Sequence, residues 1–334
     1  MILVTGGTGL VGSHLLYQLV RKKEPVRAIY RNNSNLNAVK KVFSFYTDDV
    51  ETLFSKIEWM EADLNDIPSL SLAFKGVSHV YHAAAFISFD SRYYFELRKT
   101  NIEGTANVVN LCIENNVEKL CYVSSIATLG ETLNGDIISE ETHWNPEAKN
   151  NCYAISKYGA EMEVWRGTQE GIKAIIVCPG VILGAGFPDT GSGQLFSRVQ
   201  KGMNYYTEGE CGFVDVEDVA ECMIKLMESE HSNQKYILIG ENRSFRKLFS
   251  SIAKYLNKPA PQKKLSAFTL NLLRRMDAIR SFFNGKEQVF TKATIDAALN
   301  RNYYSNEKIK KDLNISFQPL EKSIETICSR VSAP

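Results

Sequence analysis

Tyr153 and Lys157 are spaced so that both side chains can act on one reacting group. The segment Tyr153-Ala154-Ile155-Ser156-Lys157 places a phenol and an ammonium at positions i and i+4 of a predicted helix over Tyr153–Glu170, on one face. A phenol can donate or accept a proton, and a nearby ammonium favours its charged form. Because this spacing also arises by chance, it indicates proton transfer only if other functional groups converge on the same place.

The serine pair Ser124-Ser125 is the next group that could meet Tyr153 and Lys157. Ser125 precedes Tyr153 in the chain and comes directly after a predicted strand over Leu120–Ser124. If this strand belongs to a parallel sheet, its carboxyl end opens onto the crevice where such sheets bind ligands.

Short apolar strands alternate with helical patterns from Met1 to Gly180. This alternation predicts an α/β fold with a doubly wound parallel sheet, covered by helices on both faces. The predicted strands are Ile2–Thr5, Val26–Tyr30, Ile57–Ala62, Val77–Ala83, Leu120–Ser124 and Lys173–Cys178, and helices are expected at Gly12–Arg21, Ile102–Asn115 and Tyr153–Glu170.

The chain changes character after Pro179-Gly180, where a glycine-rich loop spans Gly184–Gly193. We expect residues 1–180 to form a dinucleotide-binding domain and residues 181–334 to form mainly a smaller, mostly helical substrate domain. Segments near 213–240 are expected to return to the first domain. Further elements are predicted as a helix after Gly193, a helix from Glu217 and a strand at Tyr236–Ile239. Apolar residues from Phe268 to Phe283 recur every three or four positions, which predicts a helix packed on the second domain, with a membrane-surface or partner helix as the alternative.

A glycine loop follows the first strand and opens the first helix. Gly6, Gly9 and Gly12 lie in the segment Thr5-Gly6-Gly7-Thr8-Gly9-Leu10-Val11-Gly12. Glycines allow a tight turn and let a pyrophosphate approach the backbone, while the helix N-terminus presents free N–H groups to the anion. A strand, this loop and a helix between Ile2 and Arg21 predict dinucleotide binding, with Leu10 and Val11 also at the cofactor.

The end of the second strand bears on the choice of dinucleotide. NAD-binding chains usually place a carboxylate there for the ribose 2′-hydroxyl, whereas Tyr30 is followed here by Arg31-Asn32-Asn33-Ser34. Arg31 can hold a 2′-phosphate with two hydrogen bonds, so NADP(H) is favoured and NAD(H) remains open. The alternative for Arg31 is a solvated side chain at a strand end.

Composition excludes several other classes of protein. Among the 334 residues, 39 Lys and Arg stand against 38 Asp and Glu, so the charge balance gives no reason to expect a nucleic-acid partner. No apolar run is long enough to span a membrane, and the seven scattered cysteines suggest neither a disulfide framework nor a metal site. Since the chain begins directly with a strand rather than a secretory signal, we expect a cytoplasmic protein.

These motifs, in this order, resemble the extended short-chain dehydrogenases/reductases, the NAD(P)-dependent epimerase/dehydratase family. The resemblance covers nearly all of residues 1–240. The residues that carry it are Thr5–Gly12, Asp63-Leu64, His82–Ala85, Asn101, Val123-Ser124-Ser125, Tyr153–Lys157 and Cys178-Pro179-Gly180.

The resemblance implies a role for each matching position. Tyr153 would be the general acid/base, Lys157 its activator and Ser125 the serine that holds the substrate oxygen, with Ser124 a weaker candidate. The resemblance further implies cofactor contacts at Asp63, Leu64, Ala83, Ala84, Ala85, Pro179, Gly180 and Val181. It implies that Tyr153 and Lys157 also face the cofactor.

Three functions stay open. The first is a carbonyl/alcohol oxidoreductase of the dihydroflavonol-reductase-like or 3β-hydroxysteroid-dehydrogenase-like branch, acting on a small molecule. It is favoured by the aromatic residues around Phe86 and by Cys178, which replaces an arginine often found before the proline of nucleotide-sugar enzymes. Phe86, Ser88 and Ser125 are then expected to contact the substrate. The second is a nucleotide-sugar epimerase or dehydratase, and the third is a non-catalytic sensor or scaffold. The sequence leaves a homodimer open.

Overall fold

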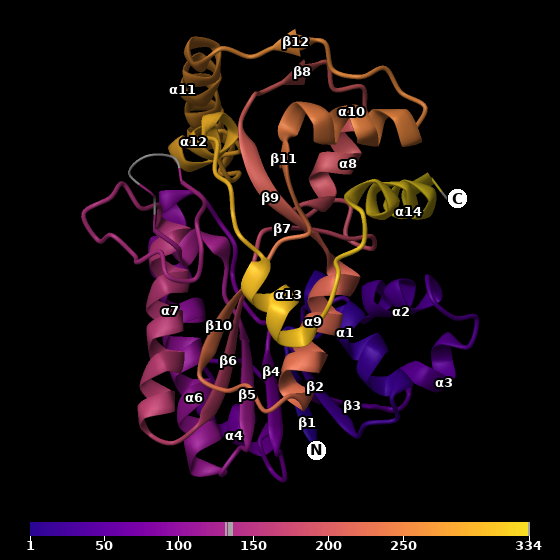
Figure 1. The fold of residues 1–334 in the computed structure, drawn as a ribbon, viewed down its shortest axis with the longest axis vertical. Helices are drawn as coiled ribbons and strands as arrows, with labels where there is room; N and C mark the ends of the chain where they lie inside the picture. Colours follow the sequence, from indigo (N-terminus) through magenta and orange to yellow (C-terminus); the bar gives the residue numbers. More distant parts are fainter. Residues whose placement is uncertain (131, 133–135, 333–334) are drawn as a thin grey trace.

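Seven parallel strands form the centre of the computed structural model, which describes residues 1–130, 132 and 136–332 (Figure 1). Their order is β10-β6-β5-β4-β1-β2-β3, so the chain starts in the middle of the sheet and winds outward in both directions. The strands are β1 (Ile2–Thr5), β2 (Val26–Tyr30), β3 (Ile57–Glu61), β4 (His79–His82), β5 (Lys119–Val123), β6 (Lys173–Pro179) and β10 (Gln234–Leu238). This arrangement confirms the predicted doubly wound sheet, and all six strands predicted between Met1 and Gly180 form within two positions of the expected bounds.

Helices cover both faces of this sheet. One apolar core contains Leu3 and Tyr122, and the other contains their neighbours Val4 and Cys121. Successive residues of a strand therefore face opposite cores, which is why these strands are apolar throughout. The first core is closed by α4 (Ile67–Ala73), α6 (Gly104–Glu114) and α7 (Cys152–Gln169), and the second by α1 (Leu10–Arg21), α2 (Leu36–Ser44), α3 (Val50–Phe54) and α9 (Val216–Glu228).

The predicted helix over Ile102–Asn115 is preceded by a less regular segment. A 3₁₀ turn (Ser91–Tyr93) and the short helix α5 (Tyr94–Leu97) lead into a π-helical stretch over Arg98–Glu103, and α6 begins only at Gly104. Single π-helical turns are rare and often occur at functional sites.

Beyond β6 the chain builds a smaller, mostly helical region. Strands β7 (Val181–Leu183), β9 (Glu210–Asp215) and β11 (Glu241–Ser244) form a three-stranded sheet. A third apolar core packs α8 (Gly193–Gln200), α10 (Phe245–Tyr255) and α14 (Leu320–Ser332) against it. The other elements here are the two-residue strands β8 (Tyr205–Tyr206) and β12 (Lys263–Lys264) and the helices α11 (Ala267–Asn284) and α12 (Lys292–Leu299). Helix α13 (Glu307–Leu313) instead returns to the seven-stranded sheet, where Ile309 joins the second core beside β10.

One expectation for this region is wrong. Helix α11 forms where the apolar repeat predicted it, but the repeat does not pack on the second domain: Phe268 is 80% exposed and Phe283 is 82% exposed. The helix instead rests on Leu270, Asp277 and Ser281, which are buried on another face. No helix built from the described residues is both long enough and apolar enough to span a membrane.

Candidate active site

The carboxyl ends of β1, β4, β5 and β6 meet at one edge of the sheet, and the predicted functional segments all follow these strands. The glycine loop follows β1, Ala83–Ala85 follow β4, Ser124 and Ser125 follow β5, and Pro179 ends β6. Strands β1 and β4 are neighbours although the chain leaves them toward opposite sides of the sheet. Such a switch point opens a crevice in which these folds bind their ligands.

The glycine loop lies so close to the backbone at the end of β4 that Gly6 has no room for a side chain. Gly6 has a φ of +72°, and a Cβ there would lie 2.5 Å from the backbone nitrogen of Ala84. A Cβ on Gly12 would overlap the carbonyl oxygen of Gly6. The first turn of α1 has no side-chain cap and no acidic residue, which leaves its N–H groups to an anion. These features fit the pyrophosphate of a dinucleotide.

The turn after β2 lies beside this loop. Ser34 accepts a hydrogen bond of 3.0 Å from the backbone N–H of Arg31, and the Thr8 hydroxyl is 3.5 Å from the Ser34 hydroxyl. Arg31 is exposed, and its guanidinium forms no ion pair with any of the described residues. The structure thus places an unpaired cation where the adenosine half of a dinucleotide would extend.

Asp63 and Leu64 lie just beyond β3, farther along the same edge. Asp63 accepts a hydrogen bond from the backbone N–H of Asn65, and Leu64 is buried against Gly104. Ala83 and Ala84 are partly buried and Ala85 is exposed, next to the glycine loop. On the far side of the crevice, Gly180 is packed so closely on β9 that a Cβ would overlap the Gly212 carbonyl, and this contact positions Pro179 and Val181.

Tyr153, Ser125 and Lys157 are brought together by β5 and α7. Asn151 caps α7 by accepting a hydrogen bond of 2.9 Å from the backbone N–H of Ala154, which places Tyr153 in the first turn. The Ser125 side chain lies close enough to the Tyr153 hydroxyl to favour a lower pKa of the phenol. Lys157, one turn further, donates to the Val123 carbonyl at 2.8 Å and lies over the ring of Tyr122. The structure therefore brings the three sequence-predicted groups to one place.

Burial disfavours charge on both titrating groups. It raises the pKa of Tyr153 to about 12, while the nearby Ser125 side chain acts in the opposite direction. Burial also lowers the pKa of Lys157 to about 7, opposed by the negative charge of Glu161. The phenol is therefore neutral near pH 7, which is the form that can donate a proton.

Glu161 is a component of the site that the sequence analysis did not single out. Its fully buried carboxylate accepts hydrogen bonds from the hydroxyls of Ser124 (2.7 Å) and Thr128 (2.8 Å) and pairs with Lys235 on β10. Ser124 and Thr128 flank the turn that carries Ser125, so this carboxylate fixes the turn onto α7. The sequence does indicate that Glu161 lies one helical turn after Lys157. It does not indicate the ion pair with Lys235, because Lys235 is distant in the sequence.

Asn101 positions the segment that follows β4. This buried residue of the π-helical stretch exchanges hydrogen bonds with the backbone of Phe86, accepting at 2.7 Å and donating at 2.9 Å, and donates to the Ser156 hydroxyl at 2.9 Å. The ring of Phe89 then meets that of Tyr153, with centroids 5.3 Å apart. Phe89, on the segment that Asn101 holds, therefore packs against the ring of Tyr153.

Ser88 and His82 have protein partners that limit their roles. The Ser88 hydroxyl is buried and donates to Glu287, which lies beyond α11. His82 lies between the hydroxyls of Thr5 and Thr105, and burial lowers its pKa to about 3. His82 is thus a neutral link between β1, β4 and α6.

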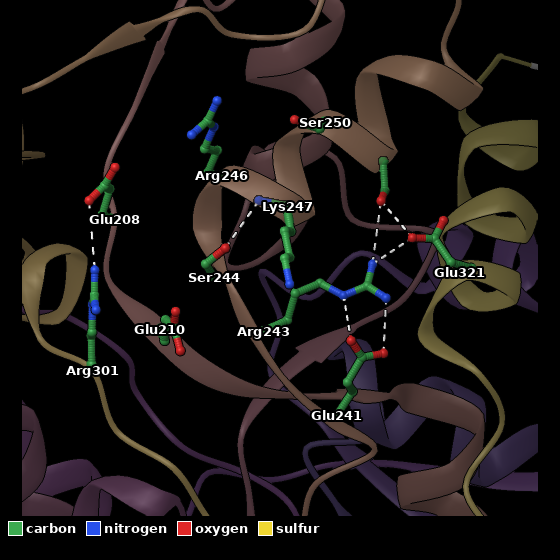
Figure 2. Close-up of a pocket in the computed structure, with 11 residues that line it drawn as sticks. Glu208, Glu210, Glu241, Arg243, Ser244, Arg246, Lys247, Ser250, Arg301 and Glu321 are labelled. Atoms are coloured by element: carbon green, nitrogen blue, oxygen red, sulfur yellow. Dashed lines mark hydrogen bonds and ion pairs between the residues drawn. The ribbon is translucent and has the colours of Figure 1, made fainter. Parts of the chain in front are cut away.

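A separate pocket of about 670 Å³ lies in the smaller region (Figure 2). Its four basic and four acidic side chains largely compensate one another: Arg243 lies between Glu241 and Glu321, and Arg301 faces Glu208. None of the predicted site residues lines it. The pocket shows no excess of positive charge for a diphosphate.

The model of the NAD-dependent epimerase/dehydratase family matches residues 2–240. The chain belongs to this family. It is an enzyme of the extended short-chain dehydrogenase/reductase type, and curated proteins similar to it include reductases.

Individual similarities support the same placement. The chain is 24% identical to dihydroflavonol 4-reductase of Callistephus chinensis, over 93% of this chain and 90% of that protein. It is similar to the crystal structure of gox2253, with a TM-score of 0.80 and 28% identity, over 99% of this chain and 97% of that one. UDP-glucose 4-epimerase of Thermotoga maritima shares the fold, with a TM-score of 0.76 and 18% identity, over 99% and 98% of the two chains.

The Glu161 network leads to a stability prediction. Glu161→Gln removes the countercharge of Lys235 and weakens the acceptor of Ser124 and Thr128, so we expect a loss of about 1–3 kcal/mol in the free energy of unfolding, measured by urea titration. Glu163→Gln is the matched control on the same helix, because its ion pair with Arg166 is partly exposed, and it should cost less than about 0.5 kcal/mol. Equal losses in the two variants would contradict the role assigned to Glu161.

Proposed function

We propose that this protein is an NADP(H)-dependent reductase that converts an apolar carbonyl compound into an alcohol, with Tyr153 as the proton donor. The observation that carries the proposal is the meeting of Tyr153, Ser125 and Lys157 beside the glycine loop, at the edge where β1 and β4 diverge. The comparisons support a nicotinamide-dependent oxidoreductase. The residues of this site support the preference for NADP(H) and for an apolar carbonyl substrate.

The cofactor would be held mainly by backbone on one side of the site. The glycine loop and the N-terminus of α1 would take the pyrophosphate, because they offer free N–H groups and no obstructing Cβ. Arg31 would bind the 2′-phosphate, and Asp63 with Leu64 would border the adenine. When bound, the dinucleotide supplies the hydride that the carbonyl carbon receives.

Side chains of this protein would bind the carbonyl oxygen of the substrate and donate a proton to it. Ser125 would hold the carbonyl oxygen by a hydrogen bond as negative charge develops on it. The neutral Tyr153 hydroxyl would donate its proton to that oxygen, which completes the alcohol. The Lys157 ammonium would stabilise the phenolate left behind, and Glu161 favours that charged form by partly opposing the effect of burial on the pKa of Lys157.

The surroundings favour an apolar substrate over a nucleotide sugar. Phe86 and Tyr93 pack edge to face with centroids 5.7 Å apart, and Phe89 lies against Tyr153. An apolar pocket with a few directed polar groups suits a carbonyl without a charged head group. Cys178, where nucleotide-sugar enzymes often carry an arginine, is fully buried and contacts Thr128, and the pocket of the smaller region is lined by equal numbers of acidic and basic side chains.

Tyr153→Phe tests the proton donor. The substitution removes one oxygen and retains the ring that packs on Phe89, so folding and NADPH affinity should persist while kcat falls by about two to four orders of magnitude. Fluorescence titration of NADPH and steady-state turnover provide the two measurements. Turnover at the wild-type rate would show that another group donates the proton.

Arg31→Ala tests the choice of cofactor. Because the guanidinium pairs with no described residue, its loss should leave the fold intact and weaken NADPH binding by roughly tenfold to a hundredfold, the range of one charge-assisted contact. NADH binding should change by less than threefold, since NADH has no 2′-phosphate. Arg98→Ala, another arginine without a carboxylate partner among the described residues, serves as the control. An unchanged preference for NADPH would assign Arg31 to solvent.

A substrate panel separates the reductase from the epimerase. A reductase consumes one NADPH per turnover, whereas an epimerase returns the hydride to its substrate and shows no net consumption. We expect NADPH oxidation, followed by the absorbance of the reduced nicotinamide, with aromatic, steroidal or aliphatic ketones and aldehydes. We expect no isomerisation of UDP- or GDP-sugars, which chromatography would detect. Sugar isomerisation at constant absorbance would support the epimerase instead.

A further inference from the structure

Helix α11 presents an apolar surface strip that no described part of the protein covers. Its exposed members are Phe268, Leu272, Met276, Ile279, Phe282 and Phe283, each about half exposed or more. At 100° per residue these side chains lie within one sector of about 120° on the helix. The buried residues Leu270, Asp277 and Ser281 lie on the opposite side. The strip therefore points directly away from the protein.

The orientation of the strip is fixed by polar contacts on the buried side. The Asp277 carboxylate accepts backbone hydrogen bonds from Val289 (2.7 Å) and Phe290 (2.9 Å) and pairs with Arg280. Ser281 accepts a hydrogen bond of 2.6 Å from Arg92 and donates to the Lys286 carbonyl. Rotating the apolar strip inward would bury it at the expense of these contacts, so its exposure is built into the fold.

Positive charge accompanies the strip. Residues 263–286 contain six basic side chains (Lys263, Lys264, Arg274, Arg275, Arg280 and Lys286) and one acidic side chain, Asp277, which is buried. Lys264 pairs with Glu208, Arg280 pairs with Asp277, and Arg274 lies on the packed side of the helix. The remaining three, Lys263, Arg275 and Lys286, have no carboxylate partner among the described residues. Exposed phenylalanine beside arginine and lysine suits the boundary between acyl chains and anionic head groups.

We propose that the exposed strip of α11 binds the surface of an anionic lipid bilayer. A second copy of this chain fits the strip less well. A helix of 18 residues is about 27 Å long and 10 Å wide, so its strip covers roughly 300 Å², against the 800 Å² per partner that stable dimers bury. Symmetric pairing would also bring two segments of like charge together.

The bilayer would then lie beside the candidate active site. Gln288, just beyond α11, donates its backbone N–H to Asp90, and Arg92 bridges Asp90 to Ser281. The same loop carries Phe89, which contacts Tyr153. Figure 1 shows α11 at the end of the molecule opposite the N-terminus. An apolar substrate dissolved in the bilayer would have a short path to Tyr153, although the docking itself does not depend on the proposed reaction.

Vesicle flotation of the full chain tests the proposal. At about 0.1 M salt we expect the wild type to float with vesicles of phosphatidylcholine containing phosphatidylserine. It should float at least tenfold less with pure phosphatidylcholine, and raising the salt to about 1 M should weaken the first interaction. The double variants Phe268→Asp/Phe283→Asp and Arg275→Glu/Lys286→Glu should each reduce binding at least tenfold.

Phe95→Asp is the matched control, since Phe95 is 78% exposed on α5 and outside the strip, and it should bind like the wild type. Thermal unfolding of every variant checks that the fold persists. Absence of wild-type binding, or undiminished binding by the phenylalanine variant, would overturn the proposal. So would a dimer in analytical ultracentrifugation that the phenylalanine variant dissociates, because it would assign the strip to a second copy.

Discussion

The parallel packing of β1 against β4 is the constraint on which the candidate site depends. The two strands are neighbours, but their helices leave toward opposite faces, so a crevice opens where they end. The glycine loop closes one side of this crevice so tightly that Gly6 and Gly12 have no room for a Cβ. The other predicted contacts at Ala84, Ser125 and Pro179 are placed relative to that backbone, because all three lie at the carboxyl ends of strands of the same sheet.

The parts of this site that rest on short-range patterns could be predicted from the sequence. The glycine loop, the strand ends and the i, i+4 spacing of Tyr153 and Lys157 are local, so each pattern carries its own geometry. The buried pair of Glu161 and Lys235 could not be predicted in this way, since it requires β10 to join the sheet next to β6. The same is true of the hydrogen bond from Ser88 to Glu287, which connects residues 199 positions apart.

For helix α11, the apolar repeat predicted the helix but not the face that packs on the protein. An apolar repeat predicts that one face of a helix avoids water, but it does not say whether protein covers that face. Here the packing is done by Leu270, Asp277 and Ser281, two of which are polar and would be assigned to the solvent side. Asp277 is buried only because the turn after the helix supplies backbone N–H groups at Val289 and Phe290. The interaction that fixes the orientation of α11 is therefore tertiary.

Burial shifts the pKa values of the candidate proton donor Tyr153 and of the neighbouring Lys157 in opposite directions. It raises the pKa of Tyr153 and lowers the pKa of Lys157, so both groups resist charge near neutral pH. A neutral phenol is ready to donate to a developing alkoxide, whereas alcohol oxidation would first require its deprotonation. The carboxylate of Glu161 limits this effect, because it is buried one turn beyond Lys157 and favours the charged form of that lysine. The same carboxylate holds Ser124 and Thr128, so the turn that places Ser125 and the charge of Lys157 depend on one buried group.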